Sequence, residues 1–143
     1  MTFIDPTRDA FAAFARVDHD GPLHMLNLLR FRDEAAYAGG QAPRAGMSGA
    51  EAYAAYSKAS APFFSRVGGE LVWSGRPLAG VIGPPGEAWD AGFLAGYPSK
   101  AAFLSMVKDE GYQAIVFHRQ AAVADSRLFA FAPREDGAPS VFG

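Results

Sequence analysis

The sequence predicts an α+β fold in which helices cover one face of a four-stranded antiparallel sheet. Four short apolar segments have the length and composition of strands, and two longer segments have the periodicity of amphipathic helices. Three of the four strands are apolar at nearly every position, which indicates that both faces of the sheet are covered. The chain has 143 residues, half of them hydrophobic, so it is long enough to bury a sizeable core in one domain.

A helix is expected before the first strand. It is predicted over residues 5–17, with a carboxylate and a proline in its first turn. The first strand, at residues 23–31, is apolar at nearly every position, as a central strand should be. A long loop follows it. The next helix is predicted over residues 48–67 and begins at a capping box formed by Ser48 and Glu51.

The second half of the chain is predicted to form three more strands and one more helix. Strands are predicted at residues 70–76, 89–97 and 123–131, and a helix over residues 100–120 is interrupted near Gly111. The resulting order of strand, helix, strand, strand, helix, strand is the split βαβ, or ferredoxin-like, pattern.

The segment between the second and third strands is rich in Gly and Pro, but Val81 and Ile82 predict a bent continuation of the second strand within it. The predicted organisation is a single domain over residues 1–143, with a ferredoxin-like core at 22–132, an N-terminal helical extension at 1–21 and a tail at 133–143.

Helices on one side leave the other face of the sheet open, yet three strands carry large apolar side chains on both faces. Their exposure would create an apolar patch larger than monomers usually present. Two such sheets packed face to face bury these side chains and close a barrel without free edges. The sequence therefore predicts an isologous homodimer that forms a dimeric α/β barrel.

Composition argues against several classes of function. The formal net charge is −2 and the 13 basic residues are scattered along the chain, so no nucleic-acid partner is expected. The chain has no Cys, and its three His lack metal-ligand spacing, so neither a metal nor another cofactor is expected. No signal peptide and no apolar run of about 20 residues is present. We therefore expect a cytoplasmic protein that does not enter a membrane.

Short blocks of sequence resemble an uncharacterised bacterial family, domain of unknown function 1330, which belongs to the dimeric α/β barrel superfamily. The resemblance covers about residues 22–130. It implies the fold and the homodimer but no particular reaction. Superfamily members include cofactor-independent monooxygenases, isomerase-like enzymes and haem-binding proteins, and related barrels place their ligand between sheet and helices. The blocks are LNLLRF (26–31), EAYAAY (51–56), GGELVWSG (68–75), WD (89–90), YPSKAAF (97–103), YQA (112–114), HR (118–119) and AVADSRL (122–128).

Three polar residues are candidates for binding a ligand in that pocket. Asn27, the only asparagine in the chain, lies mid-strand among apolar residues, and a buried amide without hydrogen bonds costs about 1–3 kcal/mol. It is either a polar anchor for a ligand or a side chain bonded to its neighbours. Tyr53 and Tyr56 share one helical face. They are either hydroxyl donors at the mouth of the pocket or core residues whose hydroxyls reach the rim.

Aromatic residues and one arginine complete the predicted pocket. Trp89, Phe93 and Tyr97 are spaced to share one face of a strand. Such a stripe is usually core, but it also suits a planar ligand. Arg119 shares a helical face with Tyr112 and is predicted to bind the ligand from there.

The remaining charged strand residues are interpreted mainly as structural. Arg30 points to the opposite face from Asn27 and is either a ligand clamp or an ion-pair partner of a neighbouring carboxylate. Asp90, Asp125 and Arg127 are predicted to form structural ion pairs.

His118 is the candidate catalytic residue. A histidine near the end of a helix is usually a favourable partner of the helix dipole, but it is also the side chain best suited to proton transfer near neutral pH. The sequence thus predicts a small-molecule-binding protein, with a cofactor-independent reaction of the monooxygenase or isomerase type as one possibility. The alternative is a non-catalytic ligand-binding or structural homodimer.

Overall fold

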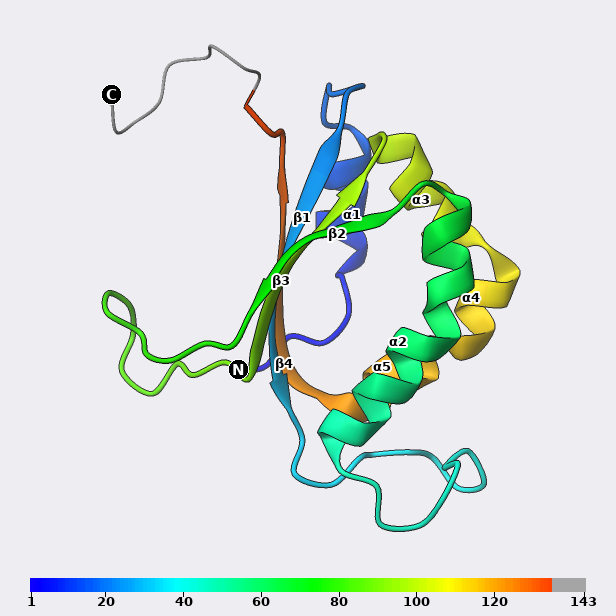
Figure 1. The fold of residues 1–143 in the computed structure, drawn as a ribbon, viewed down its shortest axis with the longest axis vertical. Helices are drawn as coiled ribbons and strands as arrows, with labels where there is room; N and C mark the ends of the chain where they lie inside the picture. The colour runs from blue at the N-terminus through cyan, green and yellow to red at the C-terminus, as the bar shows by residue number, and fades with distance from the viewer. Residues whose placement is uncertain (135–143) are drawn as a thin grey trace.

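A computed structural model describes residues 1–134 and places one four-stranded antiparallel sheet against a layer of helices (Figure 1). The strand order is β2-β3-β1-β4, so the predicted ferredoxin-like fold is confirmed. The predicted tail at residues 133–143 lies almost wholly outside the described residues. The strands are β1 (Leu23–Phe31), β2 (Glu70–Gly75), β3 (Ala91–Tyr97) and β4 (Val123–Phe131), and the helices are α1 (Arg8–Ala15), α2 (Gly49–Arg66), α3 (Lys100–Lys108), α4 (Glu110–Ile115) and α5 (Phe117–Ala122).

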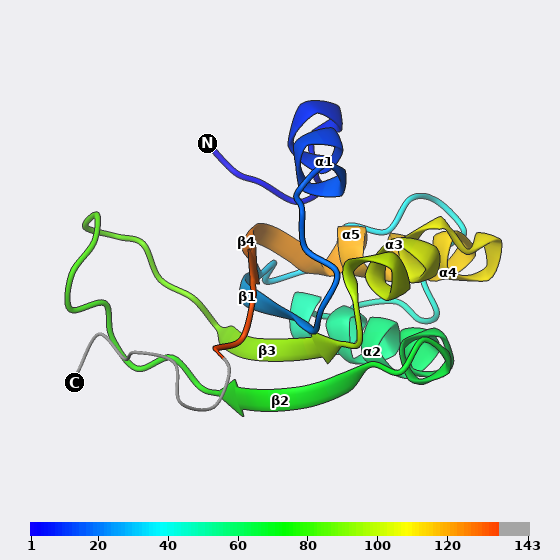
Figure 2. The ribbon, with the colours of Figure 1, turned by 90° about the horizontal axis from the view of Figure 1, so that it is seen from above.

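Strand β1 forms the centre of the core because β3 and β4 pair with its two edges. Its odd-numbered residues face the helices, and Leu23, Met25 and Leu29 among them are buried. Its even-numbered residues point to the opposite face and are half-buried. Helices α2 to α5 all lie on one side of the sheet, whereas α1 lies beside the β4 edge (Figure 2). Within residues 1–134, no helix is long and apolar enough to cross a membrane.

Local capping explains where the helices begin. The Ser48 hydroxyl accepts a hydrogen bond from the Glu51 N–H, and the Glu51 carboxylate accepts one from the Ser48 N–H, each at 3.1 Å, which is the predicted capping box. Asp109 ends α3 and caps α4, so the predicted interruption of the second helix is confirmed. A further break at Val116, which separates α4 from α5 without a side-chain cap, was not predicted.

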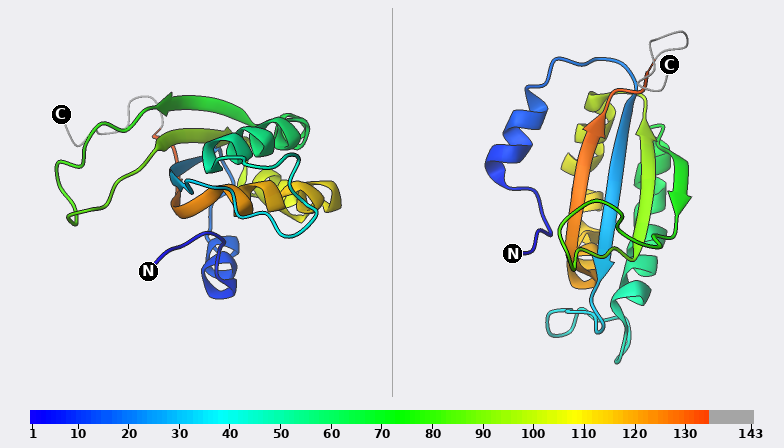
Figure 3. Two further views of the ribbon diagram at one scale, coloured as in Figure 1. Left: turned by 90° about the horizontal axis from the view of Figure 1, so that it is seen from below. Right: turned by 90° about the vertical axis from the view of Figure 1, so that its left-hand side faces the viewer.

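The segment between β2 and β3 differs from its prediction. Residues 76–90 form no strand but an arm that projects from the sheet on the side away from the helices (Figures 1 and 3). The predicted strand continuation at Val81 and Ile82 is wrong, because both side chains are almost fully exposed and have no neighbouring strand to pair with. Strand β3 begins at Ala91, two residues later than predicted.

Asp125, buried on β4, connects three parts of the chain. Its Oδ1 accepts hydrogen bonds from the N–H groups of Phe3 and Ser126 at 2.9 Å and from Arg127 Nη1 at 2.8 Å. Its Oδ2 lies 3.7 Å from Arg30 Nη2 on β1. Arg127 in turn lies 3.7 Å from Glu87 in the arm. One carboxylate therefore holds the N-terminal segment, the β1–β4 pair and, through Arg127, the base of the arm.

We predict that Asp125→Asn lowers the free energy of unfolding by about 1–3 kcal/mol near neutral pH, because buried donors lose a charged acceptor. Burial by itself raises the pKa of the Asp125 carboxyl, but the hydrogen bonds from Phe3, Arg127 and Ser126 lower it below the ordinary value of 3.8. This stabilisation is therefore present above about pH 4 and is lost as the pH falls through the folded-state pKa.

Denaturant unfolding of both proteins near neutral pH and near pH 3 measures this effect. We expect the difference between wild type and variant to shrink in acid, while an exposed control, Asp20→Asn, matches wild type at both pH values. An equal difference at both pH values would show that the Asp125 charge does not stabilise the fold.

Candidate ligand-binding site

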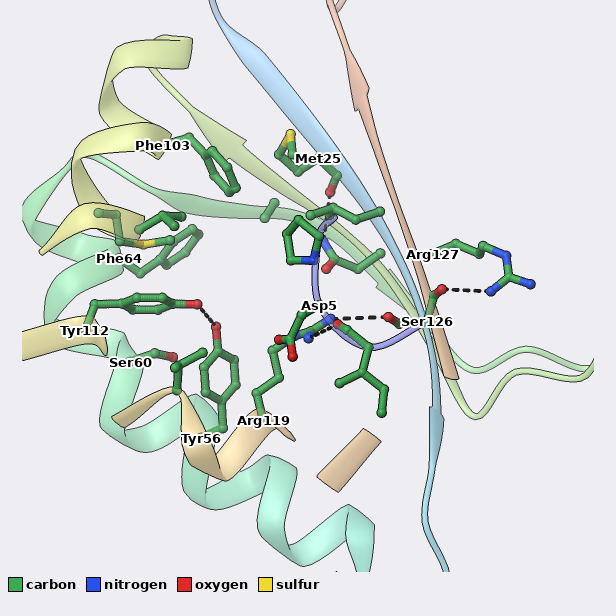
Figure 4. Close-up of a pocket in the computed structure, with 18 of the residues that line it drawn as sticks. Asp5, Met25, Tyr56, Ser60, Phe64, Phe103, Tyr112, Arg119, Ser126 and Arg127 are labelled. Atoms are coloured by element: carbon green, nitrogen blue, oxygen red, sulfur yellow. Dashed lines mark hydrogen bonds between the residues drawn. The ribbon is translucent and has the colours of Figure 1, made fainter. Parts of the chain in front are cut away.

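A cavity of about 1090 Å³ lies between the helix-facing side of the sheet and the helices (Figure 4). Known ligand pockets span roughly 300–1,000 Å³, so this one is large enough for a metabolite with several rings. Its walls are mainly apolar. They include Met25 of β1, Phe93 and Ala95 of β3, and Phe103 and Met106 of α3.

The N-terminal segment forms one wall of this cavity. Residues 3–7 and the apolar face of α1 contribute to the lining, and two hydrogen bonds hold the segment in place together with that from Phe3 to Asp125. The Ser126 hydroxyl donates to the Phe3 carbonyl at 2.7 Å, and Arg119 Nη1 donates to the Ile4 carbonyl at 2.6 Å. The far end of α1 is held by Lys100, whose Nζ donates to the carbonyls of Ala15 and Val17. The N-terminal helix, predicted as an extension outside the core, therefore belongs to the site.

Three helical tyrosines place their hydroxyls in the cavity region. Tyr53 and Tyr56 extend from α2, with ring centroids 5.3 Å apart, and the Tyr56 hydroxyl lies 2.6 Å from that of Tyr112 on α4. The arrangement follows from helix geometry, because residues three apart share a face. The Tyr56–Tyr112 pair was not predicted, although the sequence pattern placed Tyr112 on the same helical face as Arg119.

Burial favours the neutral form of Tyr53, Tyr56 and Tyr97 by raising the pKa of each. It raises the pKa of Tyr53 to about 12, an effect that the nearby Arg119 charge partly offsets. Burial also raises the pKa of Tyr56, which the adjacent Tyr112 raises further, and the pKa of Tyr97. At neutral pH the tyrosines are therefore hydrogen-bond donors and not phenolate bases.

Asn27 and Arg119 supply the other predicted polar groups of the lining. Asn27 Nδ2 donates to the Met25 carbonyl at 3.1 Å, so the amide is partly satisfied by its own strand. Its Oδ1 forms no hydrogen bond within residues 1–134. Arg119 extends from α5, and besides its bond to Ile4 it places Nη2 3.4 Å from the Ser126 hydroxyl.

The structure does not bring His118 to the cavity. Its Nδ1 lies 2.7 Å from the hydroxyl of Tyr37, which belongs to the loop after β1, and its ring stacks on Phe117 with centroids 4.2 Å apart. Burial lowers its pKa. Successive residues of a helix point about 100° apart, so α5 directs Arg119 into the cavity and His118 away from it.

Arg30, Trp89 and Asp90 also lie outside the cavity lining. Arg30 is on the opposite face of the sheet, where it pairs with Asp125. Trp89 precedes β3, and its ring lies 5.1 Å from the guanidinium of Arg127. Asp90 forms no ion pair among the described residues, contrary to its prediction, because its Oδ2 accepts the N–H of Phe31 at 2.8 Å.

Residues 1–134 contain no group of three His, Cys, Asp or Glu side chains close enough together to hold a metal ion. The cavity lining of this part of the chain instead combines apolar walls with tyrosine and serine hydroxyls, three side-chain amides, the Asp5 carboxylate and the guanidinium of Arg119. Such a set can enclose an organic molecule and donate hydrogen bonds to an oxygen on it.

Comparison with known proteins agrees with the family resemblance. The family described as domain of unknown function DUF1330 matches residues 44–131. The methylated RPA0582 protein, known from a crystal structure, has 50% sequence identity to this chain and a TM-score of 0.87. The match covers 96% of this chain and 100% of that one. A second, described as a protein of unknown function from Rhodopseudomonas palustris, is 49% identical with a TM-score of 0.86, covering 94% and 99%.

A more distant likeness supports the fold alone. An uncharacterised NIPSNAP-like domain protein from Burkholderia xenovorans is 14% identical with a TM-score of 0.51, and the match covers 85% of this chain and 92% of that one. No curated protein matches the chain.

Because of the buried tyrosines, we expect the free energy of unfolding to fall at alkaline pH. Because the folded-state pKa of Tyr53 is raised from 10.0 to about 12, its contribution to stability is complete below about pH 10 and is lost as the pH rises from there. We expect Tyr53→Phe to lose less unfolding free energy than wild type between about pH 9 and about pH 11, measured by denaturant titration. Equal losses in the two proteins would contradict the burial of this hydroxyl.

Proposed function

The chain belongs to the DUF1330 family, whose function is unknown, and we propose that it binds a small, mainly apolar molecule in the cavity between sheet and helices. The size of this cavity, about 1090 Å³, is the observation that carries the proposal. Concave, mainly apolar pockets of about this size are where proteins commonly bind small organic molecules. A bound molecule would remove the apolar walls from contact with water.

The polar groups of the cavity are suited to orienting such a molecule. The tyrosine hydroxyls stay protonated and donate, and the free Oδ1 of Asn27 accepts. They occupy opposite walls, since Tyr53 and Tyr56 lie on α2 and Asn27 lies on the sheet. A ligand with a hydroxyl group and a second oxygen on an apolar body would satisfy both walls, because the hydroxyl can donate to Asn27 and the other oxygen can accept from the tyrosines.

Catalysis is less well supported than binding. A cofactor-independent reaction needs a group that moves a proton at the bound molecule. Burial holds the tyrosines in their protonated form, and His118 faces the loop after β1. Among the described residues of the lining, Asp5 is then the remaining proton acceptor, and it is exposed at the N-terminal wall. Ligand binding is therefore the function that the geometry supports best.

We further propose that the protein acts as a homodimer through the helix-free face of its sheet. Trp73, Phe129 and Phe131 point to this face and are each about half exposed. An aromatic side chain buries roughly 150–250 Å², so these three present on the order of 300 Å² of apolar surface. The arm projects past the same face and adds three almost fully exposed apolar residues, Leu78, Val81 and Ile82. Together they exceed what monomers commonly expose, and a second copy would cover them.

Fluorescence titration with phenylnaphthylamine, an uncharged apolar probe, tests the binding proposal. We expect the wild-type protein to bind the probe, and we expect Ser60→Trp, which places a large ring at the cavity lining, to weaken binding about tenfold or more. Lys58→Trp on the exposed side of the same helix is the matched control and should bind like wild type. Absence of binding, or equal weakening by both variants, would refute a ligand-binding cavity.

Sedimentation equilibrium at micromolar concentration tests the homodimer. We expect the wild-type protein to sediment as a dimer, and Trp73→Asp and Phe129→Asp to sediment as monomers, because each places a charge in the proposed interface. Lys58→Asp is the control, since Lys58 is exposed on α2, on the other side of the sheet. A monomeric wild type, or face variants that remain dimeric, would show that the sheets do not pair in this way.

A further inference from the structure

Arg119 and Arg127 both contribute to the lining, but the guanidinium of Arg127 points to the helix-free face and is neutralised there, whereas that of Arg119 lies at the cavity. The guanidinium of Arg127 pairs with Asp125 at 2.8 Å and with Glu87 at 3.7 Å. Arg119 forms no salt bridge among the described residues, and its hydrogen-bond partners are both uncharged, the Ile4 carbonyl and the Ser126 hydroxyl. A half-buried guanidinium surrounded by apolar side chains is costly unless an anion accompanies it.

The groups around Arg119 do not supply that anion. Asp5 is the one carboxylate of the lining within residues 1–134. Its two oxygens each lie 3.4 Å from Gln120 Nε2, and it makes no ion pair with Arg119. The neighbouring tyrosines are kept neutral by burial, and the positive charge of Arg119 acts on both Tyr53 and Tyr56. Within residues 1–134, the Arg119 guanidinium therefore lies at the cavity without an ion-paired carboxylate.

Arg119 also retains unused hydrogen-bond donors. A guanidinium carries five N–H groups in a planar fork, and Arg119 uses one to reach Ile4 and one to reach Ser126. Both of these bonds go to the N-terminal wall and to β4. In Figure 4, Arg119 extends from α5 toward the N-terminal segment, between the Tyr56 side of the cavity and Ser126. The remaining donors are available to a ligand oxygen from within the cavity.

We propose that the ligand is an apolar anion, a molecule with a flat or extended hydrocarbon body and one carboxylate or similar oxyanion that pairs with Arg119. The body would lie along the apolar walls, and the tyrosine hydroxyls would donate to the same oxyanion or to a second oxygen. The inference rests on the proposed function, because it names the chemical class that the cavity would take. Charge-assisted pairing with a guanidinium is stronger than pairing with a neutral donor, so the anion gives the site its selectivity.

Two probes that share a ring system but differ in charge test the proposal. Anilinonaphthalene sulfonate carries a sulfonate anion, and phenylnaphthylamine is its uncharged counterpart. We expect wild type to bind the sulfonate more tightly than the neutral probe. We expect Arg119→Gln to weaken sulfonate binding about tenfold or more, as the loss of a hydrogen bond to a charged group does, while binding of the neutral probe stays within about twofold.

Matched variants separate charge at this site from charge elsewhere. Arg119→Lys should retain part of the preference for the sulfonate. Arg16→Gln, which removes an exposed arginine outside the lining, should leave both affinities unchanged. Asp5→Asn, which removes the carboxylate of the lining, should strengthen sulfonate binding.

The probe pair also separates failure of this inference from failure of the proposed function. If wild type binds the neutral probe as tightly as the sulfonate, or if Arg119→Gln weakens both equally, the cavity binds ligands but is not selective for anions. If wild type binds neither probe, the proposed function itself is wrong, and the inference falls with it. Loss of both probes in Arg119→Gln alone would mean that Arg119 maintains the N-terminal wall and does not pair with a ligand.

Discussion

The buried carboxylate of Asp125 is the interaction on which the functional part of this structure depends. It accepts the N–H of Phe3, and the Phe3 carbonyl in turn accepts the hydroxyl of the next residue on β4, Ser126. These bonds fix the N-terminal segment beside the edge of β4. Without that attachment the cavity would lack one wall, because residues 3–7 and α1 close the side that the helices α2 to α5 leave open.

The two faces of the sheet serve different purposes, and the charges are divided accordingly. On the helix-free face, Arg30 and Arg127 are balanced by Asp125 and Glu87, so the charged groups there hold the strands and the arm together. On the helix side, the neutral tyrosines and Arg119 face the cavity, and no carboxylate pairs with that arginine among the described residues. Structural ion pairs and binding groups therefore lie on opposite sides of the same strands.

Sequence reasoning predicted the elements well where periodicity and capping carried the signal. The bounds of β1 and β4, the capping box at Ser48 and the break near Asp109 all depend on residues close together in the chain. Prediction failed where the outcome depended on distant partners. Val81 and Ile82 have strand-like composition, yet no strand lies beside them, and His118 was assigned to the pocket although a one-residue step along α5 directs it elsewhere.

The sequence by itself determined the fold, the central position of β1 and the identity of most polar groups in the cavity, because strand and helix periodicities assign each residue to a face. Only the tertiary structure decided which of these groups meet. The pairing of Tyr56 with Tyr112 and the closure of the cavity by the N-terminal segment join residues more than fifty positions apart in the chain. The lack of a carboxylate partner for Arg119 among the described residues depends on where all the neighbouring side chains lie. Local pattern carries no information about such contacts, since they arise only when separate elements pack together.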